Sequence, residues 1–250
     1  MKRSLLRQIL LGALLIAGYS ANANASAFLT LTVGTTTLSC DNSLPFVVGG
    51  NCLGGVGFTT TLNGSSINFN GGFLGGYQVN SAGLNTVPFG SQFGDIQLGT
   101  SIAAFFPGSS ILQIDFGVNG LTAPIGIQTL FATHSGFTTP EGGTGTETFR
   151  GWERNDNTLT PGPTGATAVS TTLPCILPTA PPHQCTGPTA TFGGPNVTAP
   201  FALTGQAMIN LEIDTLVQFT DTVALTPEPN TLVLLATGML LVAATVRTRK

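Results

Sequence analysis

Apolar residues recur at every second position in two parts of this chain. The clearest cases are residues 112–118, LQIDFGV, and residues 209–214, INLEID. A period of two places alternate side chains on opposite faces of a strand, so each segment predicts a strand with one buried face. Val217 and Phe219 continue the second pattern. We therefore expect one strand, or a strand with a break, from about Ala207 to Phe219.

Shorter apolar runs predict five more strands, at residues 28–38, 57–62, 67–69, 96–98 and 125–133. Glycine pairs and threonines separate or accompany these runs, as is typical of antiparallel sheets joined by tight turns. No segment of the body has the spacing of an amphipathic helix, and its glycine and threonine content disfavours helix. The sequence predicts an all-β fold, most simply an antiparallel β-sandwich.

Residues 160–200 differ in composition from the rest, with nine of the sixteen prolines. Proline lacks the N–H that a sheet ladder needs, so we expect a long exposed connection or an insertion at the edge of the sandwich. Strands on both sides of this Pro/Thr-rich insertion are needed to complete one sandwich. Residues 26–226 are therefore expected to form a single domain.

The first 25 residues have the layout of a secretory signal peptide. Lys2, Arg3 and Arg7 precede a short apolar run, and the small residues Ala23 and Ala25 favour cleavage before Ser26. The apolar run is shorter than the roughly 20 residues that span a bilayer. Export through signal peptidase is the prediction, rather than a permanent N-terminal anchor.

Residues 227–250 combine three features at the other end of the chain. Pro227, Glu228 and Pro229 precede an uncharged apolar stretch at 231–246, and a basic tip follows that contains Arg247, Arg249 and Lys250. The stretch predicts a single transmembrane helix whose basic tip lies at the cytoplasmic headgroups, which orients the body outward.

In this order the three features resemble the PEP-CTERM sorting signal of exported bacterial proteins. The resemblance implies processing by an exosortase-like enzyme of the inner membrane near residues 227–229, after a transient membrane anchorage. It also implies a final location at the cell surface or in the extracellular polysaccharide matrix. Asn230 and Thr248 depart from the usual pattern of the signal.

The charge of the chain is concentrated at its ends. Between residues 26 and 226 there are ten acidic residues but only two basic ones, Arg150 and Arg154. An acidic body repels phosphate backbones, so nucleic acid is excluded as a partner.

The four cysteines form two local pairs, Cys40 with Cys52 and Cys175 with Cys185. In an exported protein these spacings favour two disulfides. A zinc site that includes His183 beside Cys185 is the alternative, but the C-x-x-C spacing of zinc sites is absent.

Candidate catalytic groups are few. His134 and Ser135 are adjacent, but neighbours on a strand point to opposite faces and do not form a nucleophile and base pair; we expect a surface histidine at a strand end. Glu212 and Asp214 would share a strand face about 6.6 Å apart, and with Asp115 or Glu153 they suggest a glycosidase-like carboxylate pair. The same residues are also ordinary on the polar face of a sheet.

Residues 147–157 collect the single tryptophan and both arginines of the body. Arg150, Trp152, Arg154 and Asp156 form a candidate sugar-binding platform, in which the ring covers a sugar face and the polar groups bind its hydroxyls. Asp156 with its neighbours Asn155 and Asn157 offers oxygen ligands for Ca²⁺ as an alternative, although the spacing is not that of an EF-hand. The third interpretation is a charged hairpin tip in which Arg150 and Arg154 pair with neighbouring acids and Trp152 packs on the sheet.

Together these features predict an exported surface or matrix protein, structural or polysaccharide-associated, non-enzymatic and without a required cofactor. The alternative is a secreted, glycosidase-like hydrolase that acts on extracellular polysaccharide.

Overall fold

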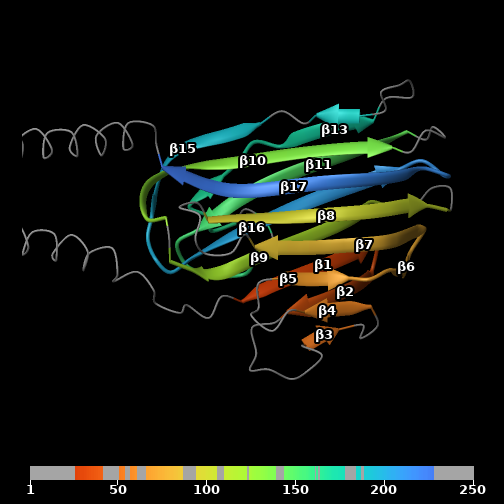
Figure 1. Cartoon of the computed structure of the whole chain (residues 1–250), viewed down its shortest axis with the longest axis horizontal. Helices are drawn as coiled ribbons and strands as arrows, with labels where there is room; N and C mark the ends of the chain where they lie inside the picture. The colour runs from red at the N-terminus through yellow and green to blue at the C-terminus, as the bar shows by residue number, and fades with distance from the viewer. Residues whose placement is uncertain are drawn as a thin grey trace, which may run out of the picture.

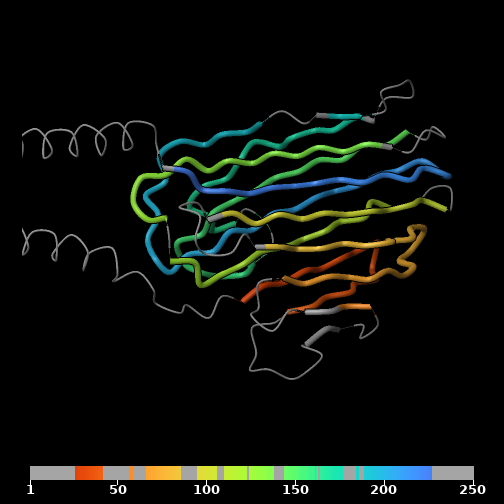
Figure 2. Tube along the Cα trace, viewed as in Figure 1, coloured from red at the N-terminus to blue at the C-terminus, as the bar shows by residue number. Residues whose placement is uncertain are grey.

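Two antiparallel sheets packed face to face form the protein, as a computed structural model shows (Figure 1). The structure describes residues 26–41, 51–53, 57–60, 66–86, 94–105, 110–122, 124–138, 144–160, 162, 164–177, 184–186 and 189–227. Figure 2 follows the same path as a tube and shows the long central strands running side by side. The predicted all-β fold with antiparallel sheets is confirmed.

The first sheet, sheet A, has eight strands in the order β12-β11-β16-β9-β1-β2-β3, with β13 also paired to β11. Its strands are β1 (Ala27–Val33), β2 (Thr36–Asp41), β3 (Asn51–Leu53), β9 (Leu112–Leu121), β11 (Gly145–Arg154), β12 (Ala168–Val169), β13 (Leu173–Leu177) and β16 (Phe201–Leu211).

The second sheet, sheet B, has nine strands in the order β14-β10-β17-β8-β7-β5-β4, with β15 also paired to β10 and β6 to β7. Its strands are β4 (Phe58–Thr60), β5 (Ser66–Phe69), β6 (Gly72–Leu74), β7 (Tyr77–Thr86), β8 (Gly94–Ala104), β10 (Gly126–Thr138), β14 (Gln184–Thr186), β15 (Ala190–Val197) and β17 (Leu216–Pro227).

Alternate residues of the central strands fill the space between the sheets. On β9 these residues are Leu112, Ile114, Phe116 and Val118, all fully buried as their period of two predicts. Phe116 stacks on Phe149 of β11 at a ring distance of 6.1 Å. The inner faces thus form a core that is mostly apolar and also encloses a few buried polar residues.

Each predicted strand overlaps an observed one, several observed strands are longer than predicted, and two predicted strands are each divided. Residues 28–38 form two strands, β1 and β2, because a turn with a positive φ at Gly34 separates them. The pattern from Ala207 to Phe219 is likewise broken, since β16 ends at Leu211 and β17 begins at Leu216. Glu212 and Asp214 therefore lie in a turn, and the prediction that they share a strand face is wrong.

The Pro/Thr-rich insertion is part of both sheets. Its strands β12 and β13 pair with β11 in sheet A, while β14 and β15 pair with β10 in sheet B. The disulfide between Cys175 and Cys185 joins β13 to β14, which confirms that predicted pair and ties the two sheets together at one edge. Of the two alternatives, the structure agrees with an insertion at the edge of the sandwich, because short runs between the prolines complete two sheet edges.

Cys40 is also disulfide-bonded. The register of β2 and β3 places Cys52 directly opposite Cys40. This backbone arrangement agrees with the predicted local pairing.

The two ends of the chain fall largely outside the described residues. The signal peptide at 1–25 and the sorting segment from Glu228 onward, including Pro229, Arg247, Arg249 and Lys250, are among the residues not described, as is His183. Pro227 ends β17 opposite Gln128. In the described part of the chain, no helix has the length and hydropathy needed to cross a bilayer.

Candidate functional site

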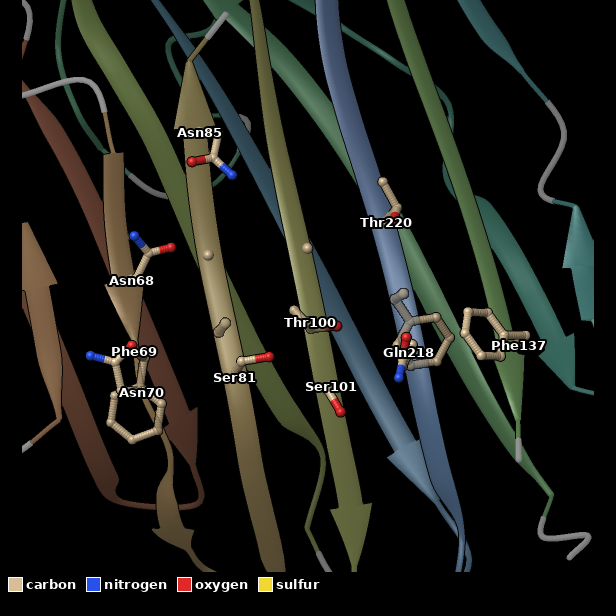
Figure 3. A pocket seen from close by; sticks show the side chains of 14 residues that line it. Asn68, Phe69, Asn70, Ser81, Asn85, Thr100, Ser101, Phe137, Gln218 and Thr220 are labelled. Carbon is tan, nitrogen blue, oxygen red and sulfur yellow. The ribbon is translucent and has the colours of Figure 1, made fainter. Parts of the chain in front are cut away.

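A groove of about 570 Å³ crosses the outer face of sheet B (Figure 3). Five adjacent strands, β5, β7, β8, β17 and β10, contribute to it. Its most polar lining side chains are Asn68, Asn70, Ser81, Asn85, Ser101, Gln218 and Thr220, and Phe137 lies at one end.

Two glycines form the floor of this groove. The register of the sheet aligns Asn68 with Gly83, Gly83 with Gly99, and Gly99 with Thr220, so one row crosses four strands. A Cβ at Gly99 would meet no atom within 4 Å, whereas a Cβ at Gly83 would lie 2.6 Å from the Asn68 side-chain oxygen. The face is hollow at Gly99 because this position carries no side chain, while the Asn68 side chain lies beside Gly83.

A second row runs beside the glycine row. Ser81 aligns with Ser101, Ser101 with Gln218, and Gln218 with Phe137. The Phe137 ring is 43% exposed, so part of its surface is available to a ligand. At about 4.8 Å between strands, the four gaps from β5 to β10 span about 19 Å, the scale of an oligosaccharide or a short peptide.

The groove is uncharged. Its fourteen lining residues include no acidic, basic or histidine side chain. Amides donate and accept hydrogen bonds, hydroxyls do both, and an exposed aromatic ring offers an apolar surface. This set can bind a neutral, hydroxyl-rich ligand, but it offers no general acid or base.

The candidate platform at 147–157 is not a surface site. Trp152 is fully buried and Arg154 is 2% exposed. The Arg154 guanidinium donates to the carbonyl oxygens of Gly162 and Thr164 at 2.6 and 2.7 Å, which holds the following loop against the strand. The sugar-platform hypothesis for Trp152 is therefore wrong, because a ring without exposed surface cannot stack on a sugar.

The two remaining platform residues do not restore the site. Arg150 is half-buried on β11, and Asp156 lies beyond the strand, 3.8 Å from the Arg154 Nη1 atom. Of the third interpretation, the pairing of Arg154 with Asp156 and the burial of Trp152 are observed. The hairpin tip itself is corrected, since residues up to Arg154 belong to a strand inside sheet A.

The three side chains proposed as Ca²⁺ ligands each accept hydrogen bonds from other groups of the protein. The Asp156 Oδ1 atom accepts hydrogen bonds from the N–H and hydroxyl of Thr158. The side-chain oxygen of Asn155 accepts from Thr198 N at 2.6 Å, and that of Asn157 accepts from Gly120 N at 2.7 Å. Because these oxygens bind different backbone segments, they do not converge on one position.

His134 lies in the middle of β10 and is 2% exposed, so the expected surface histidine at a strand end is corrected. Its Nδ1 atom lies 3.2 Å from Glu147 Oε2 and 3.6 Å from Asp221 Oδ1. Burial by itself would lower the pKa of His134, but the neighbouring Asp221 and Glu147 raise it to about 9. Ser135 is exposed on the opposite face, so the two residues form no hydrolase pair.

Burial also raises the pKa of both carboxyl groups in this cluster. For Glu147 the negative charge of Asp221 adds to the effect, while His134 opposes it. The three side chains come from β10, β11 and β17, and therefore from both sheets. This cluster could not be predicted from the sequence, because its successive members are 13 and 74 residues apart.

The proposed carboxylate pair is not assembled either. Glu212 and Asp214 are exposed on the turn between β16 and β17. Asp115 lies on β9, where Gln113 and Gln206 donate to its two oxygens at 2.6 and 2.7 Å. Its pKa is raised by burial, although both hydrogen bonds act to lower it.

The groove residues were not singled out from the sequence. The sequence pattern indicated these residues only weakly. In segments 66–86 and 94–104, polar residues alternate with buried apolar ones, and these polar residues include Asn68, Ser81, Asn85 and Ser101. Polar residues at these positions are common on any solvent-facing sheet. Only the register of five strands shows that they surround one hollow.

No family model matches the chain, and no curated protein matches it. Solved structures with some likeness include the K3 cleaved adhesin domain of Lys-gingipain from Porphyromonas gingivalis, at 15% identity and a TM-score of 0.32, covering 53% of this chain and 74% of that one.

Two further structures have lower scores. TmCBM61 in complex with beta-1,4-galactotriose is 6% identical with a TM-score of 0.28, covering 56% of this chain and 86% of that one. The enzymatically active domain of tailspike protein 4 from bacteriophage CBA120 is 10% identical with a TM-score of 0.25, covering 57% of this chain and 17% of that one. These scores are too low to infer a shared ligand or activity.

Proposed function

We propose that this chain is an exported surface or matrix protein that binds a neutral polysaccharide in the groove of sheet B. The observation that carries the proposal is the uncharged lining: amides, hydroxyls and one exposed aromatic ring surround a floor of two glycines. Sugars present hydroxyls and an apolar ring face, and this set of side chains complements both.

The same lining favours binding over hydrolysis. Glycosidases need two carboxyl groups beside the scissile bond, and the groove has none among its lining residues. The acidic body also disfavours polymers rich in uronic acid or sulfate, because like charges repel. The ligand class we propose is therefore a neutral glycan chain.

In this proposal, the two ends of the chain direct its export and processing. Signal peptidase would act before Ser26, and an exosortase-like enzyme would act near Pro227, Glu228 and Pro229. Export would place the sandwich at the cell surface or in the extracellular matrix, where a neutral polysaccharide is accessible.

A glycan array with neutral and acidic members tests the proposal. We expect the wild-type chain to bind neutral glycans selectively. Thr220→Val, which removes a hydroxyl from the groove, and Phe137→Ala, which removes the ring, should each weaken binding about 3- to 10-fold.

Thr222→Val is the matched control, since Thr222 lies on the same face of β17 but does not line the groove. Equal losses for Thr220→Val and Thr222→Val, or selective binding of acidic glycans, would contradict the proposal.

A further inference from the structure

Three metal-ligating side chains meet between the two sheets, away from the groove. Asp221 of β17 is the direct register partner of His134 on β10, and Glu147 reaches them from β11 of the opposite sheet (Figure 1). All three side chains have no exposed surface. One ligand atom from each lies within 4.8 Å of the other two.

The two distances from His134 to the carboxylates match the ligand spacing of a tetrahedral ion. With Zn–N and Zn–O bonds of about 2.0 to 2.2 Å, two ligands of a tetrahedral ion lie about 3.3 to 3.6 Å apart. The Nδ1 atom of His134 lies 3.2 Å from the Glu147 oxygen and 3.6 Å from the Asp221 oxygen. A neutral imidazole with its proton on Nε2 would direct the Nδ1 lone pair toward both carboxylates.

Several polar atoms of the cluster lack hydrogen-bond partners. They are both oxygens of Asp221, Oε1 of Glu147 and Nε2 of His134, each inaccessible to solvent. Buried polar atoms in native proteins are ordinarily satisfied, and unsatisfied ones are costly. Two carboxylates and a neutral imidazole carry a charge of −2, which a divalent cation balances.

We propose that His134, Glu147 and Asp221 bind a divalent transition metal ion, with Zn²⁺ the best fit, and that this ion joins the two sheets. Imidazole suits Zn²⁺ better than Mg²⁺ or Ca²⁺, and the two oxygens are acceptable zinc ligands. If Glu147 or Asp221 binds the ion through both of its oxygens, the site becomes a distorted four-coordinate one.

The neighbouring sulfur atoms are not ligands in this proposal. A ring nitrogen of His134 and the sulfurs of Cys175 and Cys185 lie within 4.8 Å of one another, but the sulfurs form a disulfide and offer no thiolate. The ion would therefore be held by one nitrogen and by oxygen atoms. It would enter during folding, because the closed sandwich buries all three ligands.

The test uses the full chain in detergent, refolded with Zn²⁺ or Co²⁺ and then dialysed. We expect about one metal ion per chain by elemental analysis, and the visible absorption of four-coordinate Co²⁺. Glu147→Gln and Asp221→Asn should weaken metal affinity at least about 100-fold.

Glu153→Gln is the matched control. Glu153 is on the same strand as Glu147 and equally buried, but it has no histidine beside it. This variant should retain the metal. A folded wild-type chain that retains no metal, or a Glu147→Gln chain that retains as much as wild type, would overturn the proposal.

X-ray absorption at the zinc edge on the wild-type chain gives an answer even if the variants do not fold. Imidazole and oxygen scattering with no sulfur supports the assignment, and sulfur ligands would contradict it.

Discussion

Glu153 carries a fully buried ionisable group into the space between the sheets. Burial raises its pKa to about 7, the negative charge of Asp156 adds to this, and Thr167 opposes it. The unfolded chain loses this proton near its ordinary value of 4.5, whereas the folded chain holds it until about pH 7. The free energy of unfolding therefore falls as the pH rises through this window.

Replacing Glu153 by glutamine removes the ionisable group, and therefore also the decrease in the free energy of unfolding as the pH rises. We expect Glu153→Gln to raise the melting temperature by a few degrees at about pH 8 and to change it little at about pH 4. Thermal melts followed by circular dichroism at both values measure the difference. Glu212→Gln, on an exposed turn, is the control. An equal effect of Glu153→Gln at both pH values would show that ionisation is not the cause.

Predictions from residue identity alone placed Trp152 and His134 wrongly at the surface. An aromatic ring between two arginines resembles a binding surface, and a lone histidine between Thr133 and Ser135 resembles a surface residue. Both are buried: Trp152 lies on the outer side of β11, where β12 pairs beside it, and His134 faces two carboxyl groups from other strands. Neither environment can be deduced from neighbours in sequence, because the contacting residues come from distant segments.

At the scale of the elements, the alternation of apolar and polar residues predicted a strand correctly where one face of that strand is wholly apolar. Strands β9 and β16 have such faces; β9 was predicted, and β16 was predicted from Ala207 onward. Strand β11 was missed because its inward positions include Glu147, Gly151 and Glu153, which remove the period-two pattern. The same acids that hid this strand now form part of the buried polar core.

The edge formed by β13 and β14 depends on a covalent link between the sheets. Short strands with few neighbours have little stability of their own, and the Cys175–Cys185 disulfide closes a local loop across the two layers. Changing both cysteines to serine should lower the free energy of unfolding by about 2 to 4 kcal/mol.

Chemical denaturation of this double variant beside the wild-type chain measures that loss. A midpoint equal to that of the wild type would mean that the edge is held by other contacts.

At the scale of the whole molecule, the described sandwich begins and ends where the sequence places its two sorting segments. Strand β1 begins at Ala27, one residue after the predicted cleavage site, and β17 ends at Pro227, the first residue of the proposed sorting motif.

Processing near the motif predicts a defined change in mass. Replacing Glu228 by alanine, or deleting residues 231–250, should alter the C-terminus and the release of the protein from cells. Intact-mass analysis reads the C-terminus directly, and Glu212→Ala provides a control acid in the body. Wild-type protein isolated from the cell surface with Lys250 still attached would argue against this processing.

The fold class could be predicted from the sequence, but the groove could not. The groove combines side chains from Asn68 on β5 to Thr220 on β17, which are more than 150 residues apart. A shift of one residue in any of these strands would turn the polar row toward the core. The groove therefore exists only through a register that local patterns do not specify.

Gly99 gives the most direct test of neutral-glycan binding. A Cβ at this position points into open space, and its φ is not in the left-handed region, so valine is sterically allowed and suits a strand. Titration calorimetry of wild type and Gly99→Val with a neutral oligosaccharide selected on the array compares their affinities. We predict that Gly99→Val melts at or above the wild-type temperature but binds at least about 10-fold more weakly. A folded Gly99→Val protein with wild-type affinity would contradict the assignment of the groove.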